Sequence, residues 1–358
     1  MVDWLTGKRI KGTSTERTTT AGIGTGVAGW VELGRTTLGV AGDNITISSL
    51  ANKRYYMILR SVKGTTVGGV QASGQLGSGS IDTGSNYATR YNDNGGSDGT
   101  LTSRIHGFDG YNGTPEFTVQ YISNYSTKEK LVINSTVSQH TAGAGNVCNR
   151  RESVWKWSNT SNALDIYNCY NNGGDDLGSG SEVVVLGWDP ADTHSTNFWT
   201  ELASVNATGS TTSFDSGVFT AKKYLWIQGY VKSTTGQNVN IRVGNTTIDS
   251  GGNYSMRRSS DGAADNLQTS FAAMAQLDSG NAQFFNLFIV NNATNEKLGI
   301  GHSVAQSTAG AGTAPSRTEF VGKWANTSNQ INIIQFLNNA GSPTNYTSAS
   351  TMKVWGSD

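Results

Sequence analysis

The sequence is poor in the residues that mark disulfide-linked, metal-binding and catalytic proteins. It has 358 residues but only 2 cysteines, 4 histidines and 4 prolines. Two cysteines cannot form a disulfide framework for a chain of this length, so we expect Cys148 and Cys169 to be unpaired core thiols. The histidines do not follow the spacing of a metal site, and there is no Gly-x-Ser-x-Gly elbow. We therefore do not expect an enzyme.

Charge is also scarce, and it is balanced. Charged residues make up 15% of the chain, and 26 basic side chains face 26 acidic ones. This composition gives no broad attraction to nucleic acid or to an anionic membrane, so we expect neither partner. No run of about 18 apolar residues occurs, and MVDWLTGKRIKG has no stretch typical of a signal peptide. We expect synthesis in the cytoplasm and partners recognised by shape and polar contacts.

Glycine and aromatic residues, by contrast, are plentiful, with 45 Gly, 9 Trp, 13 Tyr and 11 Phe. Short β-branched and aromatic runs alternate with Gly, Asn, Asp and Ser clusters, a pattern typical of strands and tight turns. The alternation predicts a half-buried strand with Phe117, Val119 and Tyr121 on one face, whereas 283–290 is apolar on both faces and predicts cover on both sides. The run at 270–277 could form a helix, but we predict a strand. The predicted strands lie at 54–62, 115–123, 130–137, 151–157, 163–170, 182–188, 223–231, 283–290, 297–304, 318–324, 330–337 and 351–355.

An internal repeat sets the organisation of the chain. Residues 127–166 and 294–333 are identical at 22 of 40 positions without a gap. Copies of about 160 residues are tandem domains, too long for solenoid units. We predict an all-β fold of two tandem antiparallel β-sandwich, jelly-roll-like domains, related by duplication, with eight to ten strands each. The predicted parts are an extended N-terminal arm (1–28), domain 1 (29–188), a linker (189–197) and domain 2 (198–358).

Both copies contain the glycine-rich loop TAGAG, at 141–145 and 308–312. A phosphate-binding loop needs a following helix and a Gly-Lys-Ser/Thr sequence, and neither follows here. The glycines instead predict a wide turn with positive φ between two strands, needed equally by both copies.

A set of polar residues also recurs in the two copies. Its alternation along one strand face predicts a ladder of opposite charges, with Trp157 and Trp324 pointing the other way into each core. A catalytic role is disfavoured because no nucleophile or base recurs beside the set. The set consists of Arg150, Glu152, Lys156 and Asn159, with Arg317, Glu319, Lys323 and Asn326.

Three weaker candidate sites remain. Tyr87, Tyr91 and Tyr254 stand beside Gly/Asn turns, where aromatic rings could stack on a glycan. The acidic loops at 91–99 and 171–178 offer oxygen ligands for calcium, although solvated turns are favoured. The arm carries apolar and basic residues that could anchor assembly, namely Trp4, Leu5, Lys8, Arg9 and Lys11.

The opening WLTGKRIKGTSTERTTT, followed by two jelly-roll-like copies, resembles virion structural proteins of marine tailed phages, of the capsid or decoration type. The domain pairing is also similar to double jelly-roll capsid proteins. The resemblance implies location in the virion and assembly as a homo-oligomer, with a trimer favoured, together with other virion proteins. It carries over no catalytic residue. A glycan-binding appendage module and a polysaccharide-active enzyme stay open as alternatives.

Overall fold

The computed structural model describes residues 29–66, 71–189, 197–277, 280–306 and 308–358. Within these ranges all regular elements are strands. The described residues contain no helix long and apolar enough to cross a membrane. The all-β prediction is therefore confirmed. The arm with its five anchor candidates, and most of the linker, lie outside the described residues.

The first half of the chain forms two antiparallel sheets. The larger has eight strands in the order β1, β13, β3, β9, β10, β11, β6, β7, and the smaller has β2, β12, β4 and β5, with β8 paired to β4. The strands are β1 (Val31–Thr37), β2 (Asn44–Ile47), β3 (Tyr55–Val62), β4 (Gln71–Ser78), β5 (Ser80–Ile81), β6 (Tyr87–Asp93), β7 (Gly99–Arg104), β8 (Gly107–Asn112), β9 (Glu116–Ser123), β10 (Lys130–Ser138), β11 (Asn149–Trp157), β12 (Ile166–Asn171) and β13 (Glu182–Trp188).

The second half forms another pair of antiparallel sheets. Their orders are β14, β26, β16, β22, β23, β24, β19, β20 and β15, β25, β17, β18, with β21 paired to β17. The strands are β14 (Thr200–Asn206), β15 (Ser213–Asp215), β16 (Tyr224–Gln237), β17 (Val239–Asn245), β18 (Thr247–Ile248), β19 (Tyr254–Ser260), β20 (Asn266–Phe271), β21 (Ala275–Gln276), β22 (Gly280–Val290), β23 (Lys297–Gln306), β24 (Ser316–Trp324), β25 (Ile333–Asn338) and β26 (Thr351–Ser357).

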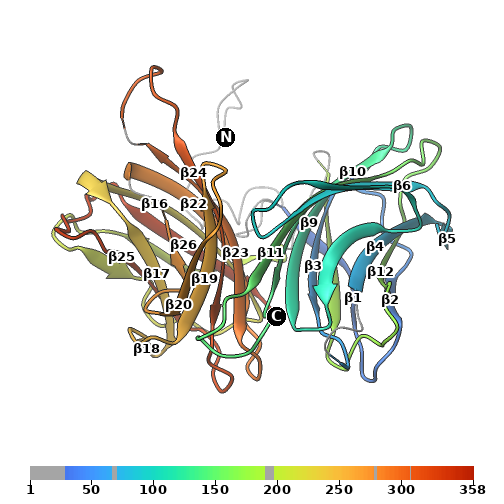
Figure 1. The fold of residues 1–358 in the computed structure, drawn as a ribbon, viewed down its shortest axis with the longest axis horizontal. Coiled ribbons are helices and arrows are strands. Elements are labelled where there is room, and N and C mark those ends of the chain that lie inside the picture. Colours follow the sequence, from blue (N-terminus) through green and yellow to red (C-terminus); the bar gives the residue numbers. More distant parts are fainter. Residues whose placement is uncertain (1–28, 67–70, 190–196, 278–279, 307) are drawn as a thin grey trace, which may run out of the picture.

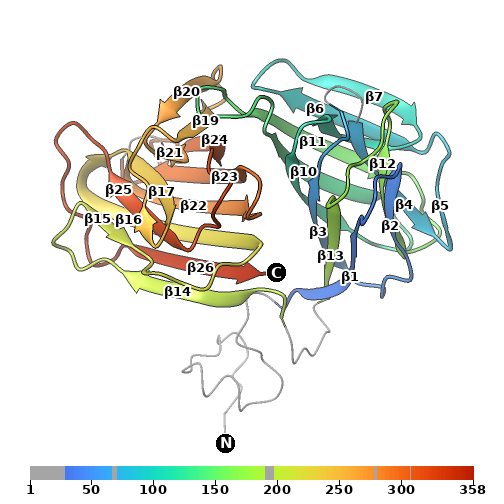
Figure 2. The same ribbon diagram turned by 90° about the horizontal axis from the view of Figure 1, so that it is seen from below.

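The two halves have the same strand order, and the strand numbers in corresponding places differ by 13 throughout (for example β10 and β23). The duplication inferred from the sequence predicts this likeness. Each half has more strands than the eight to ten expected, because short edge strands such as β5 and β18, and also interior strands such as β4 and β17, were not recognised. The run at 270–277 contains the end of β20 and all of β21. Figures 1 and 2 show the two halves as separate bodies joined side by side.

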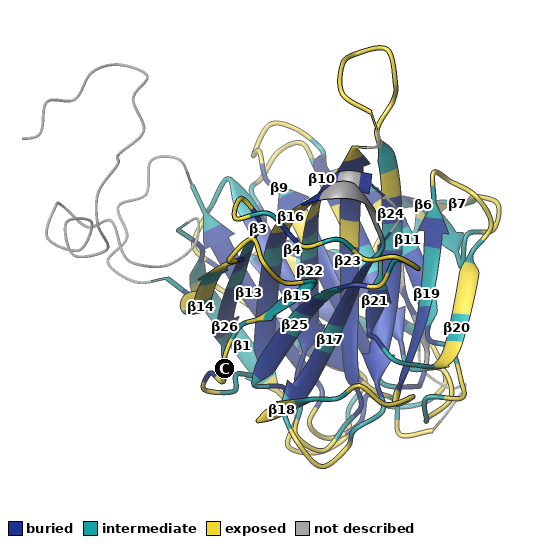
Figure 3. Cartoon of the chain, turned by 90° about the vertical axis from the view of Figure 1, so that its left-hand side faces the viewer, coloured by how far each residue is buried: buried dark blue, intermediate teal, exposed yellow. Residues whose placement is uncertain are grey.

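Each half encloses its own apolar core between its two sheets. Trp157 and Trp324 lie in these cores, as predicted, and Figure 3 shows buried residues along β17 and exposed ones along the edge strand β20. The Trp157 indole donates a hydrogen bond to Asp82 (2.7 Å), and Trp324 donates to Asp249 (2.8 Å). Asp82 belongs to the sequence IDTGSNY (81–87) and Asp249 to its copy IDSGGNY (248–254), so the repeated motif forms the same structural corner in both halves.

Strand β9 differs from its prediction, because it is buried on both faces for most of its length. Phe117 and Val119 point away from the sandwich core toward the second half. The opposite face carries Gln120 into the core, where it accepts a hydrogen bond from Tyr167 (2.8 Å). The half-buried assignment was wrong because a polar core face looks like a solvent face in sequence. For β22, cover on both sides is confirmed over 285–290, since Leu287 lies in its own core and Phe288 against the first half, whereas Phe284 is exposed.

Candidate interaction site

A third apolar cluster lies between the two sandwiches. It contains residues of both large sheets, including Leu59 and Phe117 from the first half and Trp226 and Phe288 from the second. The Trp226 and Phe288 rings are stacked, with centroids 5.2 Å apart. Figure 1 shows β9 and β11 of the first half beside β23 of the second, so the outer faces of the large sheets meet here. This cluster joins the halves as a hydrophobic core joins two layers.

Arg150 is the centre of an ion network at this contact. Its guanidinium lies 2.8 Å from Asp265, 3.2 Å from Glu319 and 3.0 Å from Glu152. Asp265 and Glu319 belong to the second half, and the Arg150 side chain is almost fully buried. A buried charge is costly unless it is paired, so removing one partner of such a network is strongly destabilising. The network therefore couples the two halves.

Glu152 also has a partner in the second half, the His302 side chain. His302 Nε2 lies 3.4 Å from its carboxylate. Burial raises the pKa of the Glu152 carboxyl, but the His302 hydrogen bond and the Arg150 charge outweigh it, so the pKa lies below its ordinary value. The charged carboxylate is thus the form that the contact favours.

The first TAGAG loop packs on the second half. Lys323 Nζ donates to the Thr141 carbonyl (2.5 Å) and lies 3.4 Å from Glu296. The Gly143 amide donates to the other Glu296 oxygen (2.6 Å), and Gly143 has a φ of 90°. The positive φ predicted for the glycine turn is confirmed in both copies, since Gly310 has a φ of 97°. Further bonds link Lys323 to the Gln139 carbonyl, Ser255 to the Asn146 carbonyl, and the Ser270 amide to the Ala144 carbonyl.

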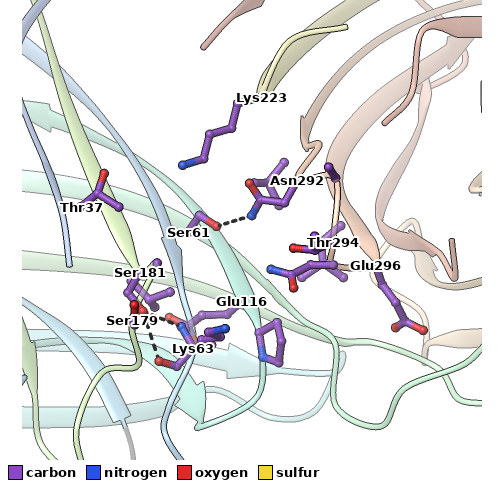
Figure 4. Close-up of a pocket in the computed structure, with 17 residues that line it drawn as sticks. Thr37, Ser61, Lys63, Glu116, Ser179, Ser181, Lys223, Asn292, Thr294 and Glu296 are labelled. Carbon is purple, nitrogen blue, oxygen red and sulfur yellow. Dashed lines mark hydrogen bonds between the residues drawn. The ribbon is translucent and has the colours of Figure 1, made fainter. Parts of the chain in front are cut away.

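A cavity of about 400 Å³ lies at another part of the contact and is lined by polar residues of both halves (Figure 4). Asn292 donates across it to Ser61 (3.4 Å). Its carboxylates have cationic partners, because Glu116 pairs with Arg60 (3.1 Å) and Glu296 with Lys323. Both carboxylates at this cavity are therefore already paired with a cation of the protein.

The tyrosine candidates do not form a common site. Tyr87 and Tyr254 are buried, with 1% and 0% of their surface exposed. Their hydroxyls donate to the Leu76 and Val243 carbonyls inside each sandwich. A glycan cannot stack on these two rings, so that assignment was wrong. Tyr91 is partly exposed, and the Arg151 guanidinium lies 5.3 Å from its ring centre.

The carboxylates of the two acidic loops contact protein groups. Asp93 pairs with Arg151 (2.6 Å) and Asp98 with Arg90 (3.4 Å), while Asp175 accepts a hydrogen bond from Thr65 (2.5 Å). Over the described ranges, no group of three or more His, Cys, Asp or Glu residues is arranged to hold a metal ion.

The two cysteines are unpaired and buried, as predicted. Cys169 lies in the core of the first sandwich, whereas Cys148 lies in the cluster between the halves. Burial raises the pKa of the Cys148 thiol to about 12, which leaves it protonated and unreactive at neutral pH.

The repeated polar residues lie partly where the sequence predicts. Arg150 pairs with Glu152 along β11, but Lys156 pairs with Glu129 instead (2.8 Å). Asn159 has a local role, because its side chain accepts the Ser161 amide (2.9 Å), as Asn326 accepts the Ser328 amide (2.8 Å). The partners of Arg150 in the second half were missed. The available signal was the high identity of the repeat at charged, outward-facing positions.

Comparisons with known proteins give no family for the chain. No family model and no curated protein matches it. Human GIVD cytosolic phospholipase A2 is matched at 8% identity, over 76% of this chain and 33% of that one, with a TM-score of 0.12. The arabinofuranosyltransferase AftD from mycobacteria is matched at 8% identity, over 92% and 35%, with a TM-score of 0.12. The chain thus spans about a third of each structure, and likenesses this low support no argument about fold or function.

Proposed function

We propose that the chain is a structural subunit of a virion, a capsid or capsid-decoration protein of a tailed phage, whose role is adhesion between protein surfaces. The observation that supports this is the contact between the sandwiches, which combines an aromatic centre with buried ion pairs. An apolar centre with a polar surround is typical of protein interfaces that are strong without net charge.

The same contact gives a physical account of the role. Each sandwich is a rigid antiparallel body, and the bonds of the first TAGAG loop fix the orientation of the second body on the first. A rigid pair of this kind presents its outer surfaces at a fixed angle, which a symmetric shell or appendage requires. The arm would extend the reach of the subunit to a neighbour.

Deletion of residues 1–28 tests the role of the arm. We expect the shortened chain to fold with unchanged circular dichroism but to be lost from purified particles, because the arm secures the subunit across a junction. Mass spectrometry of the particles measures incorporation, and hundreds of copies of the full chain per particle are expected for a shell or decoration subunit. Unchanged incorporation of the shortened chain, or absence of the full chain from particles, would contradict the proposal.

A glycan-binding appendage is the second candidate. It is favoured by the partly exposed ring of Tyr91 beside a cavity of about 360 Å³. A glycan array tests it, with binding expected for the natural chain and lost in Tyr91→Ala. If no glycan binds, this candidate fails and the assembly role stays.

A further inference from the structure

The contact between the halves joins two unlike surfaces, and each has a second version elsewhere in the chain. We call the surface supplied by the first half the first plug, and the surface that receives it the second socket. The first plug consists of Gly95, loop 141–145 and Arg150, and the second socket of Arg257, Asp265, Glu296, Glu319 and Lys323. At an offset of 167 residues lie the second plug, with Gly262, loop 308–312 and Arg317, and the first socket, with Arg90, Asp98, Glu129, Glu152 and Lys156.

Strand pairing shows that these versions occupy the same places in the two sandwiches. Arg150 is paired with Val137 across β10 and β11, and Arg317 with Val304 across β23 and β24. Lys156 likewise faces Leu131, as Lys323 faces Leu298. The two sockets also hold the same internal ion pairs, Lys156 with Glu129 and Arg90 with Asp98, matching those of the second socket.

One plug and one socket are engaged in the chain, and the other two are exposed. Lys323 and Glu296 have 0% and 3% of their side chains exposed, against 45% and 37% for Lys156 and Glu129. Arg150 is 5% exposed, and Arg317 is 62% exposed. All residues of loop 308–312 are exposed. Apart from Glu152, which contacts Arg150 and His302, the second plug and the first socket therefore keep the residues of the contact without making it.

The apolar residues beside them follow the same rule. Phe117 and Val137 are buried next to the first plug, whereas their counterparts Phe284 and Val304 are 46% and 42% exposed. Leu298, Ile300 and Val321 flank the second socket and are buried. Their counterparts beside the first socket, Leu131, Ile133 and Val154, are exposed. Large aliphatic side chains held in water cost free energy that a matching surface recovers.

The first socket also contains a cavity of about 360 Å³, lined by Asp98, Glu152 and Val154 among others. The counterparts of Asp98 and Glu152 in the second socket are Asp265 and Glu319, which hold the Arg150 guanidinium. The cavity thus has a carboxylate at each matching place. Glu152 also contacts Arg150 and His302, but Glu319 likewise pairs with Arg317 while it holds Arg150. The exposed Arg317 is the arginine at the matching place.

We infer that the second plug of one chain binds the first socket of another, so that the partner of these surfaces is a second copy of this chain. The contact between chains repeats the one within the chain: Arg317 enters between Asp98 and Glu152, and loop 308–312 lies on Lys156 and Glu129. Because plug and socket differ, the association is head-to-tail, which gives a closed ring or a filament. The inference concerns the purified chain and stands without the virion role.

Two single variants and their mixture test the inference by native mass spectrometry and light scattering of the full chain. The natural chain should form species of two or more copies of 37.9 kDa. Arg317→Glu damages the second plug and Ile133→Asp the first socket, so each alone should be a single chain. Their mixture should form a 1:1 pair, because one partner retains the socket and the other the plug. Val40→Asp, at an aliphatic residue that is 78% exposed and distant in sequence from both surfaces, is the matched control and should leave the mass of the natural species unchanged.

A natural chain that stays single at high concentration overturns the inference. That result would be expected if the second plug bound the first socket of the same chain. Unchanged masses of both variants would also overturn it, because another surface would then join the copies. Failure of the mixture to pair, while each variant is single, would overturn the head-to-tail contact and indicate like-with-like association. None of these results bears on incorporation into particles, so the virion proposal is judged separately. Circular dichroism confirms that each variant is folded.

Discussion

The two TAGAG loops have the same five residues but different surroundings. The loop at 141–145 binds Lys323 and Glu296 of the second sandwich, whereas the loop at 308–312 is exposed. Both keep a glycine with positive φ at the third position. The local sequence therefore determines the turn, and the neighbouring sandwich determines what the turn binds. Variants at matched positions in the two halves separate these contributions.

The largest difference is expected between Arg150→Ala and Arg317→Ala. Loss of Arg150 leaves Asp265 and Glu319 with less compensating charge in a buried contact, which should cost about 3 to 5 kcal/mol. Loss of the exposed Arg317 removes a surface pair and should cost less than about 1 kcal/mol. Denaturant unfolding, followed at a concentration where the chain is single, measures both. Equal losses would show that the Arg150 network does not couple the halves.

A difference in acid sensitivity is expected next, because His106 is buried in the first half and its counterpart at the 167-residue offset is Ala273. Burial and the nearby Arg104 lower the pKa of the His106 imidazole from 6.5 to about 4. Between these values the unfolded chain binds more protons than the folded one, so stability falls as the pH drops from 6.5 toward 4. Complete titration of His106 should lower the free energy of unfolding of the first half by about 3 kcal/mol.

Hydrogen exchange of peptides from β4 and β17, corrected for the intrinsic rate at each pH, compares the two halves. Peptides from β4 should lose more protection than those from β17 on acidification. His106→Gln should remove the excess loss, since glutamine does not titrate. An excess that persists in this variant would assign the sensitivity to carboxylates instead.

The smallest difference is expected between Gly143→Ala and Gly310→Ala. A Cβ at positive φ strains the backbone in both loops, by about 1 to 2 kcal/mol where the loop is held in place. Gly143 is held by Glu296, whereas the exposed second loop can relax, so its variant should cost under about 1 kcal/mol. Thermal unfolding of the two variants measures the difference. A larger effect at Gly310 would reverse the comparison.

The twelve strands given ranges from the sequence and the core tryptophans were predictable, because alternation with period two is a local property, but strands such as β4 and β17 were not recognised. The polar face of β9 was not, since the partner of Gln120 is Tyr167, which comes from a distant strand. The burial of Tyr87 and Tyr254 was missed although both end the repeated IDxGxNY motif, which forms a closed corner with its own Asp. The part of each large sheet's outer face that is covered depends on how the two sandwiches pair. No local sequence pattern predicts that pairing.

The different locations of the two thiols allow separation of the sandwiches to be distinguished from unfolding. Cys148 lies between the sandwiches, so parting the two bodies uncovers it while each remains folded. Cys169 lies inside the first sandwich and becomes reachable only when that body opens. The ratio of the two alkylation rates therefore reports, without any introduced label, whether a stress such as denaturant or a mutation acts on the joint or on the bodies themselves.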